Sequence, residues 1–204
     1  MPIVRTDIPI TAARCNEYIL QLANTYPACR TEQLTASAFQ RPIRTLTIGN
    51  GPRKVLYTAA HHANEWITAL ILLKFGEDLA AAIAAGDQIG GYNAQEVAQN
   101  ATIYMVPMVD PDGVDLVVGA IAPGTVQYET ARTLAERYPA IPFPDGWKAN
   151  LLGVDLTLQY PPAGYKPGKS NSPRVTPGPG HGISWAARRW TSWKAGHWQA
   201  LRSL

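Results

Sequence analysis

One segment constrains the fold more than any other, because an apolar run of strand length leads through two histidines into a long helical pattern. Residues 54–60, KVLYTAA, have the length and apolar content of a buried strand. From Glu65 to Ala85 apolar residues recur at helical spacing, and Gly86 supplies a stop signal. A strand followed closely by a long helix is typical of layered α/β folds. We therefore expect a sheet with helices packed against it.

Other segments extend this interpretation. The further predicted elements are a helix at 11–25 with Thr11 as its cap, a strand at 43–49, a buried strand at 101–109, a weak helix at 125–138 and a short strand at 153–158. Asn50-Gly51 predicts a hairpin, and residues 110–113, DPDG, predict a turn. The predicted fold class is α/β, with a mixed, mostly parallel sheet flanked by helices.

Charge and composition divide the chain into two parts. After Asp155 there are seven basic residues and no acidic one, whereas residues 1–155 carry 11 basic and 15 acidic side chains. Prolines and glycines are so dense in residues 161–182 that neither helix nor sheet is expected there. We predict a domain at 1–165 and an irregular basic tail at 166–204, first Pro/Gly-rich and then Trp/Arg-rich.

Composition also excludes several classes of protein. With 46% hydrophobic and 16% charged residues the chain can bury a core, so wholesale disorder is excluded. No run approaches about 18 apolar residues, and the first fifteen residues lack the apolar core of a signal peptide. Two cysteines, Cys15 and Cys29, cannot supply a disulfide framework. The expected location is the cytoplasm, with both thiols free.

The chemistry centres on His62 and Glu65, which lie three positions apart where the strand gives way to the helix. On a helical turn both side chains project from the same face. An imidazole and a carboxylate that converge there make two ligands of a tetrahedral zinc site. The alternative makes Glu65 a favourable acid at a helix N-terminus and His62 a loop residue beside the cap. Spacing alone leaves both interpretations open.

Four blocks in order resemble a known family. HHANEWIT (61–68) resembles the zinc-ligand segment of the metallocarboxypeptidase family M14, above all its bacterial γ-D-glutamyl-diaminopimelate endopeptidases. The other blocks are LTIGNGPRKVLYTAA, YMVPMVDPDGVDLV and WKANLLGVDLTLQYPPAG, and the resemblance covers roughly residues 40–165. It implies the N-terminal part of a carboxypeptidase-like catalytic domain. It also implies a Zn²⁺-dependent peptidase whose substrates are peptides or muropeptides with γ-D-glutamyl-diaminopimelate bonds.

The resemblance also assigns roles to individual residues. His62 and Glu65 match the first two zinc ligands of the family, and Asp155 matches the carboxylate that accepts a hydrogen bond from the ligand histidine. Without the family, Asp155 reads as a polar residue in a turn at a strand end. His61 cannot pair with Glu65 at this spacing, so we expect it to pack in the loop.

This chain departs from the family pattern at several positions. Leu152 stands where the family has the arginine of the oxyanion site, and Thr157 stands where it has an asparagine that helps hold the substrate carboxylate. Asp110 also replaces an asparagine. The third zinc ligand and the general-base glutamate belong to the family's C-terminal half, and no glutamate follows Glu136. No catalytic residue is therefore assigned.

The tail leaves several alternatives open. His181 and His197 lie near the family's interval for a third ligand, but neither follows a strand-like run. Residues from about 172 onward fit an out-of-frame translation or a truncated gene. Alternatively, residues 183–204 form a basic, Trp-rich helix that contacts an anionic membrane. No nucleic-acid partner is expected.

The functional alternatives to an active peptidase are a truncated, catalytically incompetent family member and a non-enzymatic module that binds peptidoglycan fragments. Because the family's sheet continues beyond the matched part, truncation would open sheet edges near residues 103 and 155 and promote aggregation.

Overall fold

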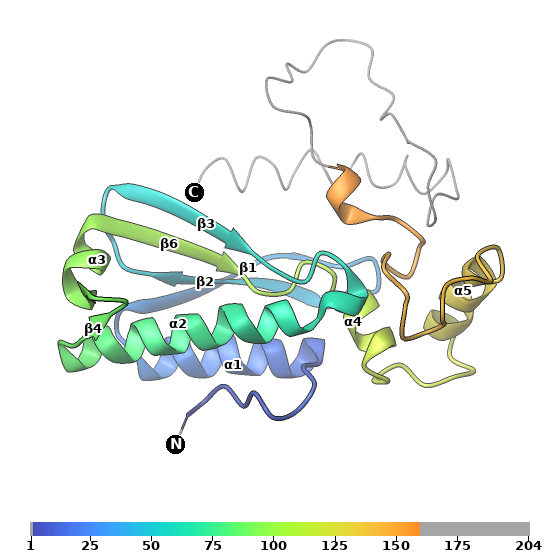
Figure 1. Cartoon of the computed structure of the whole chain (residues 1–204), viewed down its shortest axis with the longest axis horizontal. Coiled ribbons are helices and arrows are strands. Elements are labelled where there is room, and N and C mark those ends of the chain that lie inside the picture. The colour runs from blue at the N-terminus through green and yellow to red at the C-terminus, as the bar shows by residue number, and fades with distance from the viewer. Residues whose placement is uncertain (1, 160–204) are drawn as a thin grey trace, which may run out of the picture.

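The computed structural model describes residues 2–159, which form the layered α/β arrangement expected from the sequence (Figure 1). The predictions on the tail, including the boundary at 165/166, His181 and His197, lie outside these residues. The elements follow in the order α1 (Ala12–Thr25), β1 (Cys29–Ala36), β2 (Pro42–Ile48), β3 (Arg53–Thr58), η1 (Ala63–Glu65), α2 (Ile67–Ala85), β4 (Gln88–Ile89), β5 (Tyr92–Asn93), α3 (Ala94–Asn100), β6 (Ala101–Val106), α4 (Pro111–Val117), α5 (Val126–Ala135) and η2 (Leu156–Gln159).

The main sheet of the described part has four strands in the order β1-β2-β6-β3. β2 is antiparallel to both β1 and β6, whereas β6 is parallel to β3. The sheet is therefore mixed, which confirms the predicted α/β class, although in the described part only the β3–β6 pairing is parallel. Helices α1 and α2 lie along the same face of this sheet (Figure 1). Across residues 2–159, no helix combines the length and the hydropathy that crossing a bilayer requires.

The core lies between this face of the sheet and the two helices. Leu22 of α1, Leu46 of β2 and Leu73 of α2 are fully buried there. Helix α2 approaches the sheet closely at Gly76, where an added Cβ would lie 3.0 Å from Cδ2 of Leu46. The sequence signals for both helices are confirmed: Thr11 caps α1 by accepting from the Arg14 amide, and α2 ends at a left-handed Gly86.

The hairpin predicted at Asn50-Gly51 is wrong, because β6 lies between β2 and β3. The Gly51 amide donates to the Ala101 carbonyl at the start of β6, at 3.2 Å. A Cβ on Gly51 would lie 2.1 Å from the carbonyl carbon of Asn100. Gly51 thus allows two backbones to cross closely. The Asn50-Gly51 dipeptide is equally compatible with a tight turn, so the sequence alone does not distinguish the two structures.

Strand β3 is largely exposed, although its apolar sequence predicts a buried strand. Leu56 and Tyr57 expose 47% and 46% of their surface. The cause is the position of β3 at one edge of the described sheet, with β6 on one side only. The open edge therefore lies at β3. β6, which contains residue 103, lies inside the sheet, so an edge near 103 is not observed.

Three further local predictions differ from the structure. The predicted turn at 110–113 begins helix α4, because Asp110 caps it and Pro111 occupies its first position. The predicted strand at 153–158 is instead a turn followed by the 3₁₀ helix η2. Strand β1 was not predicted, because its sequence CRTEQLTA is mostly polar and carries little apolar alternation.

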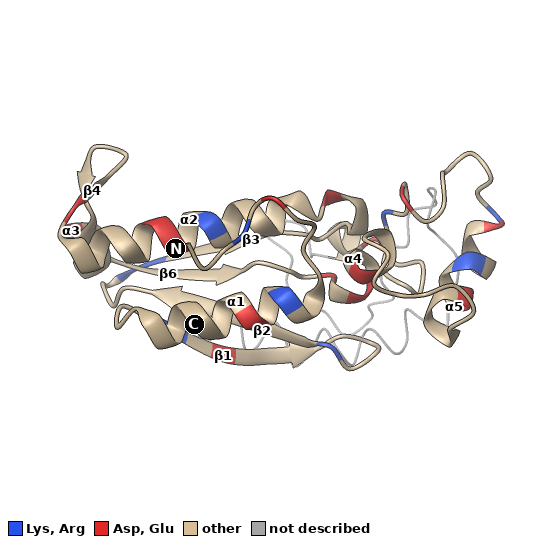
Figure 2. Ribbon diagram, turned by 90° about the horizontal axis from the view of Figure 1, so that it is seen from below, with Lys and Arg blue, Asp and Glu red and all other residues tan. Residues whose placement is uncertain are grey.

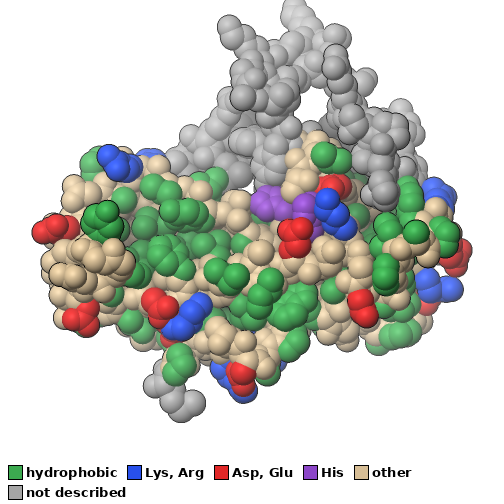
Figure 3. Space-filling model, in the orientation of Figure 1, with side chains coloured by type: hydrophobic (Ala, Val, Ile, Leu, Met, Phe, Trp, Pro, Cys, Tyr) green, Lys and Arg blue, Asp and Glu red, His purple; other side chains and the backbone are tan. Residues whose placement is uncertain are grey.

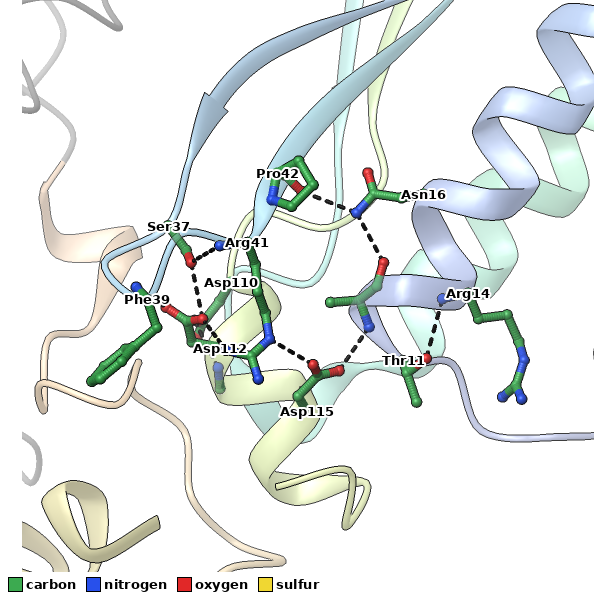
Figure 4. A network of polar contacts seen from close by, with 12 residues as sticks. Thr11, Arg14, Asn16, Ser37, Phe39, Arg41, Pro42, Asp110, Asp112 and Asp115 are labelled. Carbon is green, nitrogen blue, oxygen red and sulfur yellow. Dashed lines mark hydrogen bonds and ion pairs between the residues drawn. The ribbon is translucent and has the colours of Figure 1, made fainter. Parts of the chain in front are cut away.

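A buried network of charges joins the β1–β2 connection to α4 and α1 (Figure 4). The Arg41 guanidinium lies 2.8 Å from an Asp112 oxygen and 2.7 Å from an Asp115 oxygen. Ser37 donates to Asp112 at 2.9 Å, and Asp115 accepts from the Ala12 amide at 2.7 Å. Two of the acidic residues, Asp112 and Asp115, belong to α4, where the ribbon is coloured red (Figure 2). The network fixes α4 against the end of the sheet where the histidines lie.

Asp110, beside this network, is buried without a countercharge of its own. One oxygen accepts from the Gly113 amide at 3.0 Å, and the other is buried with no hydrogen-bond partner. Burial raises the pKa of Asp110 well above its ordinary value of 3.8, and the nearby carboxylates of Asp112 and Asp115 raise it further.

We therefore expect Asp110→Asn to change how stability depends on pH. The pKa of Asp110 is higher in the folded protein than in the unfolded chain. The contribution of this group to protein stability is therefore greatest below about pH 4, and it is lost as the pH rises through the folded-state pKa. Relative to the wild type, Asp110→Asn should gain free energy of unfolding as the pH is raised from about 5 to about 8. Urea unfolding at both pH values measures this, with the exposed Asp87→Asn as control. An equal difference at both pH values would contradict it.

An apolar stripe crosses the exposed side of α2 next to β3. Ile67, Ile71 and Phe75 lie four residues apart and expose 47%, 63% and 38% of their surface. Tyr57 of β3 meets Phe75 edge to face, with ring centroids 6.2 Å apart. Hydrophobic side chains gather over this face (Figure 3). Together with the open edge of β3, the stripe makes a surface prone to association.

Ile71→Gln should reduce self-association of the chain without a large loss of stability, because Ile71 is the most exposed member of the stripe. Sedimentation velocity over a range of concentrations would measure the change. The matched control is Val126→Gln on α5, where the valine is 74% exposed but lies outside the stripe. An equal effect of both substitutions would mean that general hydrophobicity, rather than this surface, drives association.

Candidate metal centre

A sharp bend after β3 brings the two histidines out of the sheet. Ala60 adopts a left-handed conformation (φ +46°), which costs a residue with a side chain on the order of 1 kcal/mol. Its amide donates to the Thr68 hydroxyl at 2.9 Å, and its carbonyl accepts from the Asp110 amide at 2.9 Å. The same Thr68 hydroxyl donates to the Glu65 carbonyl. The bend is thus held from α2 on one side and from α4 on the other.

His62 and Glu65 meet across the short 3₁₀ turn η1 that follows. Nδ1 of His62 lies 3.0 Å from Oε1 of Glu65, as the three-residue spacing predicts. The histidine side chain is 12% exposed and the glutamate 55%. Histidine side chains reach the surface here beside acidic and basic neighbours (Figure 3).

The other ring nitrogen of His62 faces a segment far along the chain. Nε2 lies 3.2 Å from Oδ1 of Asp155 and 3.2 Å from Oγ1 of Thr157. Asp155 is 93 residues away in sequence, so only the tertiary fold brings the two side chains together. The structure therefore groups His62, Glu65 and Asp155, the three residues singled out from the sequence.

The segment before Asp155 is anchored by a buried tryptophan. Trp147 is 2% exposed, and its ring N–H donates to the Asn150 carbonyl at 3.1 Å. The Asn150 side chain accepts two backbone N–H groups from the turn at 152–154. The Ala63 amide donates to the Lys148 carbonyl at 3.0 Å, which ties this segment directly to η1. These bonds set the position from which Asp155 reaches His62.

The surroundings of Asp155 favour its ionised form. Burial opposes ionisation, but hydrogen bonds from Thr157 together with the neighbouring His62 and Lys148 outweigh it and lower the pKa of Asp155. The Lys148 ammonium lies 3.3 Å from Oδ2. No local pattern along the chain predicts this ion pair, because it depends on the turn that Asn150 stabilises.

His61 lies close to the pair, and the charges of its neighbours affect its pKa. Burial lowers the pKa of His61, and the neighbouring His62 lowers it further, while Glu65 and Asp155 act in the opposite direction. The packing role expected of His61 from the sequence stays a prediction.

The donor set of His62 and Glu65 fits a zinc ion. Nδ1 of His62 is buried and has no hydrogen-bond partner, because its 3.0 Å contact with Glu65 lacks the geometry of a hydrogen bond. Neutral imidazole nitrogen and carboxylate oxygen are ordinary zinc ligands, and two such ligands on a tetrahedral ion lie about 3.3 Å apart. Within residues 2–159, no group of three His, Cys, Asp or Glu side chains is placed to hold a metal. Two protein ligands alone make a weak site.

Two of the sequence departures are also located by the structure. Leu152 is partly buried in the turn before Asp155, and its side chain offers no hydrogen-bond donor. The Thr157 hydroxyl donates to Oδ1 of Asp155 at 2.6 Å. The Thr157 hydroxyl therefore contacts His62 and Asp155.

Comparison with known proteins places this chain in a family. The family model for zinc carboxypeptidases, Peptidase M14, matches residues 15–189. The chain belongs to the zinc carboxypeptidase family. Over 161 residues it is 35% identical to gamma-D-glutamyl-L-diamino acid endopeptidase 1 of Lysinibacillus sphaericus, covering 79% of this chain and 39% of that protein.

A second relative and a solved structure are also similar to this zinc carboxypeptidase chain. It is 31% identical to the uncharacterized protein YqgT of Bacillus subtilis, over 70% of this chain and 38% of that protein. Among solved structures, thrombin activatable fibrinolysis inhibitor shares the fold at a TM-score of 0.50 and 17% identity, covering 58% of this chain and 31% of that one. The chain spans about two fifths of the length of the curated relatives that it matches.

Asp155→Asn should weaken Zn²⁺ binding, because an amide can donate to Nε2 of His62 and so move the ring proton to the ligand nitrogen. We expect a loss of about 10- to 100-fold in affinity, the usual effect of losing an outer partner of a metal-binding histidine. Isothermal titration with Zn²⁺ measures it, and the exposed Asp145→Asn on the same segment is the control. Unchanged affinity in Asp155→Asn would show that the carboxylate does not support the ligand.

Proposed function

We propose that this chain carries the metal-binding part of a zinc-dependent peptidase, and that its substrates are peptides with γ-D-glutamyl-diaminopimelate bonds. The observation that carries the proposal is the pair formed by Nδ1 of His62 and Oε1 of Glu65, 3.0 Å apart, with the nitrogen lacking a hydrogen-bond partner. Family membership supports the choice of zinc. The name of the relative from Lysinibacillus sphaericus supports the bond type.

His62 and Glu65 would each supply one ligand to the metal. When bound, zinc supplies Lewis acidity toward a peptide carbonyl and lowers the pKa of water. His62 offers Nδ1 as a ligand because Asp155 accepts the proton on Nε2 at 3.2 Å. Glu65 offers a carboxylate oxygen from the solvent side.

A second candidate function is metal binding without hydrolysis, as in a catalytically incompetent family member or a module that binds peptidoglycan fragments. It is favoured by Leu152, which stands where the family resemblance places an arginine. A hydrocarbon side chain cannot stabilise the negative charge that develops on the carbonyl oxygen during peptide hydrolysis.

Glu65→Gln separates these functions. Replacing a direct ligand should reduce Zn²⁺ affinity by more than the roughly 10- to 100-fold cost of losing an outer partner. The measurements are Zn²⁺ titration and chromatographic detection of γ-D-glutamyl-diaminopimelate peptide cleavage, with the exposed Glu96→Gln on α3 as control.

Each outcome decides between the two. Cleavage by the wild type and by Glu96→Gln, but not by Glu65→Gln, supports the peptidase. Zinc binding that depends on Glu65 but is accompanied by no cleavage supports the second candidate. A wild-type chain that binds no zinc overturns both the metal site and the peptidase.

A further inference from the structure

The contacts of Thr157 differ from those that its position in the family pattern predicts. By resemblance it occupies a position that contacts substrate, but its hydroxyl donates to Oδ1 of Asp155 at 2.6 Å. Its backbone N–H donates to the same oxygen at 3.0 Å. The hydroxyl oxygen also lies 3.2 Å from Nε2 of His62. One side chain thus contacts both the histidine and the carboxylate that orients it.

Counting protons fixes the direction of these bonds. A hydroxyl has a single proton, and that of Thr157 goes to Oδ1 of Asp155, the same oxygen that accepts the Thr157 backbone N–H. The hydroxyl oxygen is therefore left with acceptor capacity alone. Both groups within 3.2 Å of Nε2 of His62 are then acceptors. Nε2 must carry a proton to satisfy either of them, and in a neutral ring this leaves Nδ1 with a free lone pair.

We propose that Thr157 is a positioning residue, whose hydroxyl joins Asp155 in holding the His62 proton on Nε2 and so keeps Nδ1 directed toward Glu65 and a metal. This inference rests on the proposed function of the site. The two bonds from Thr157 to one oxygen also fix the rotation of the Asp155 carboxylate. The histidine therefore meets a carboxylate that is already oriented.

The test compares Thr157→Val, which keeps the shape and removes the hydroxyl, with Thr157→Ser, which keeps the hydroxyl. Thr130→Val is the control, because its hydroxyl also makes a local hydrogen bond, to the Val126 carbonyl at 2.7 Å, but lies on α5. The first readout is the tautomer of His62 in the metal-free protein, from ¹⁵N NMR of the imidazole at about pH 9, well above the ordinary histidine pKa of about 6.5. The second is Zn²⁺ affinity by calorimetry.

We expect the wild type and Thr157→Ser to hold His62 in the Nε2–H form, and Thr157→Val to populate both tautomers. Zinc affinity should fall about tenfold in Thr157→Val, the lower end of the range for an outer partner because Asp155 remains. Thr157→Ser and Thr130→Val should match the wild type. An unchanged tautomer and affinity in Thr157→Val would overturn the proposal.

The two readouts separate this inference from the proposed function. If the wild type binds no zinc but shows the Nε2–H tautomer, with the mixture in Thr157→Val, the peptidase fails and the positioning role stands. If Thr157→Val does not fold, the wild-type spectrum decides by itself, because an Nδ1–H tautomer there would overturn the role of Thr157.

Discussion

The parallel pairing of β3 with β6 is the constraint on which the rest of this structure depends. It runs in register from Arg53 to Thr58, and the backbone bonds continue past the strand ends, from the Val109 amide to Ala59 and from the Asp110 amide to Ala60. Parallel strands finish at the same edge of a sheet. The chain therefore leaves β3 into the histidine turn directly beside the start of α4, and each segment supports the other.

One side of this junction contains the ion pairs that stabilise the fold, and the other side contains the candidate metal ligands. On the α4 side, Arg41 pairs with both Asp112 and Asp115 in a largely buried network, where removing one partner of a buried pair typically costs about 3–5 kcal/mol. On the other side, Glu65 is more than half exposed and β3 presents an open edge. The rigid network holds the histidine turn in place, and the exposed side leaves a donor pair accessible to a metal and to further segments.

The departures from the family pattern have different physical consequences. Burial raises the pKa of Asp110, which favours a neutral acid similar in shape to the asparagine that the family resemblance places there. Thr157 turns inward, where its contacts support His62 through Asp155. Leu152 stands where the family resemblance places an arginine, and no rearrangement of a hydrocarbon side chain supplies a hydrogen-bond donor.

The sequence by itself determined the features that depend on neighbours along the chain. The caps and apolar spacing of α1 and α2 fix those helices, and the three-residue interval puts His62 and Glu65 on one turn. Only the tertiary structure decided that β6 separates β2 from β3, that β3 is an exposed edge, and that Asp155 reaches a histidine 93 residues earlier. Local spacing and capping act over one or two turns, whereas strand order, burial and distant contacts depend on which surfaces pack together across the whole chain.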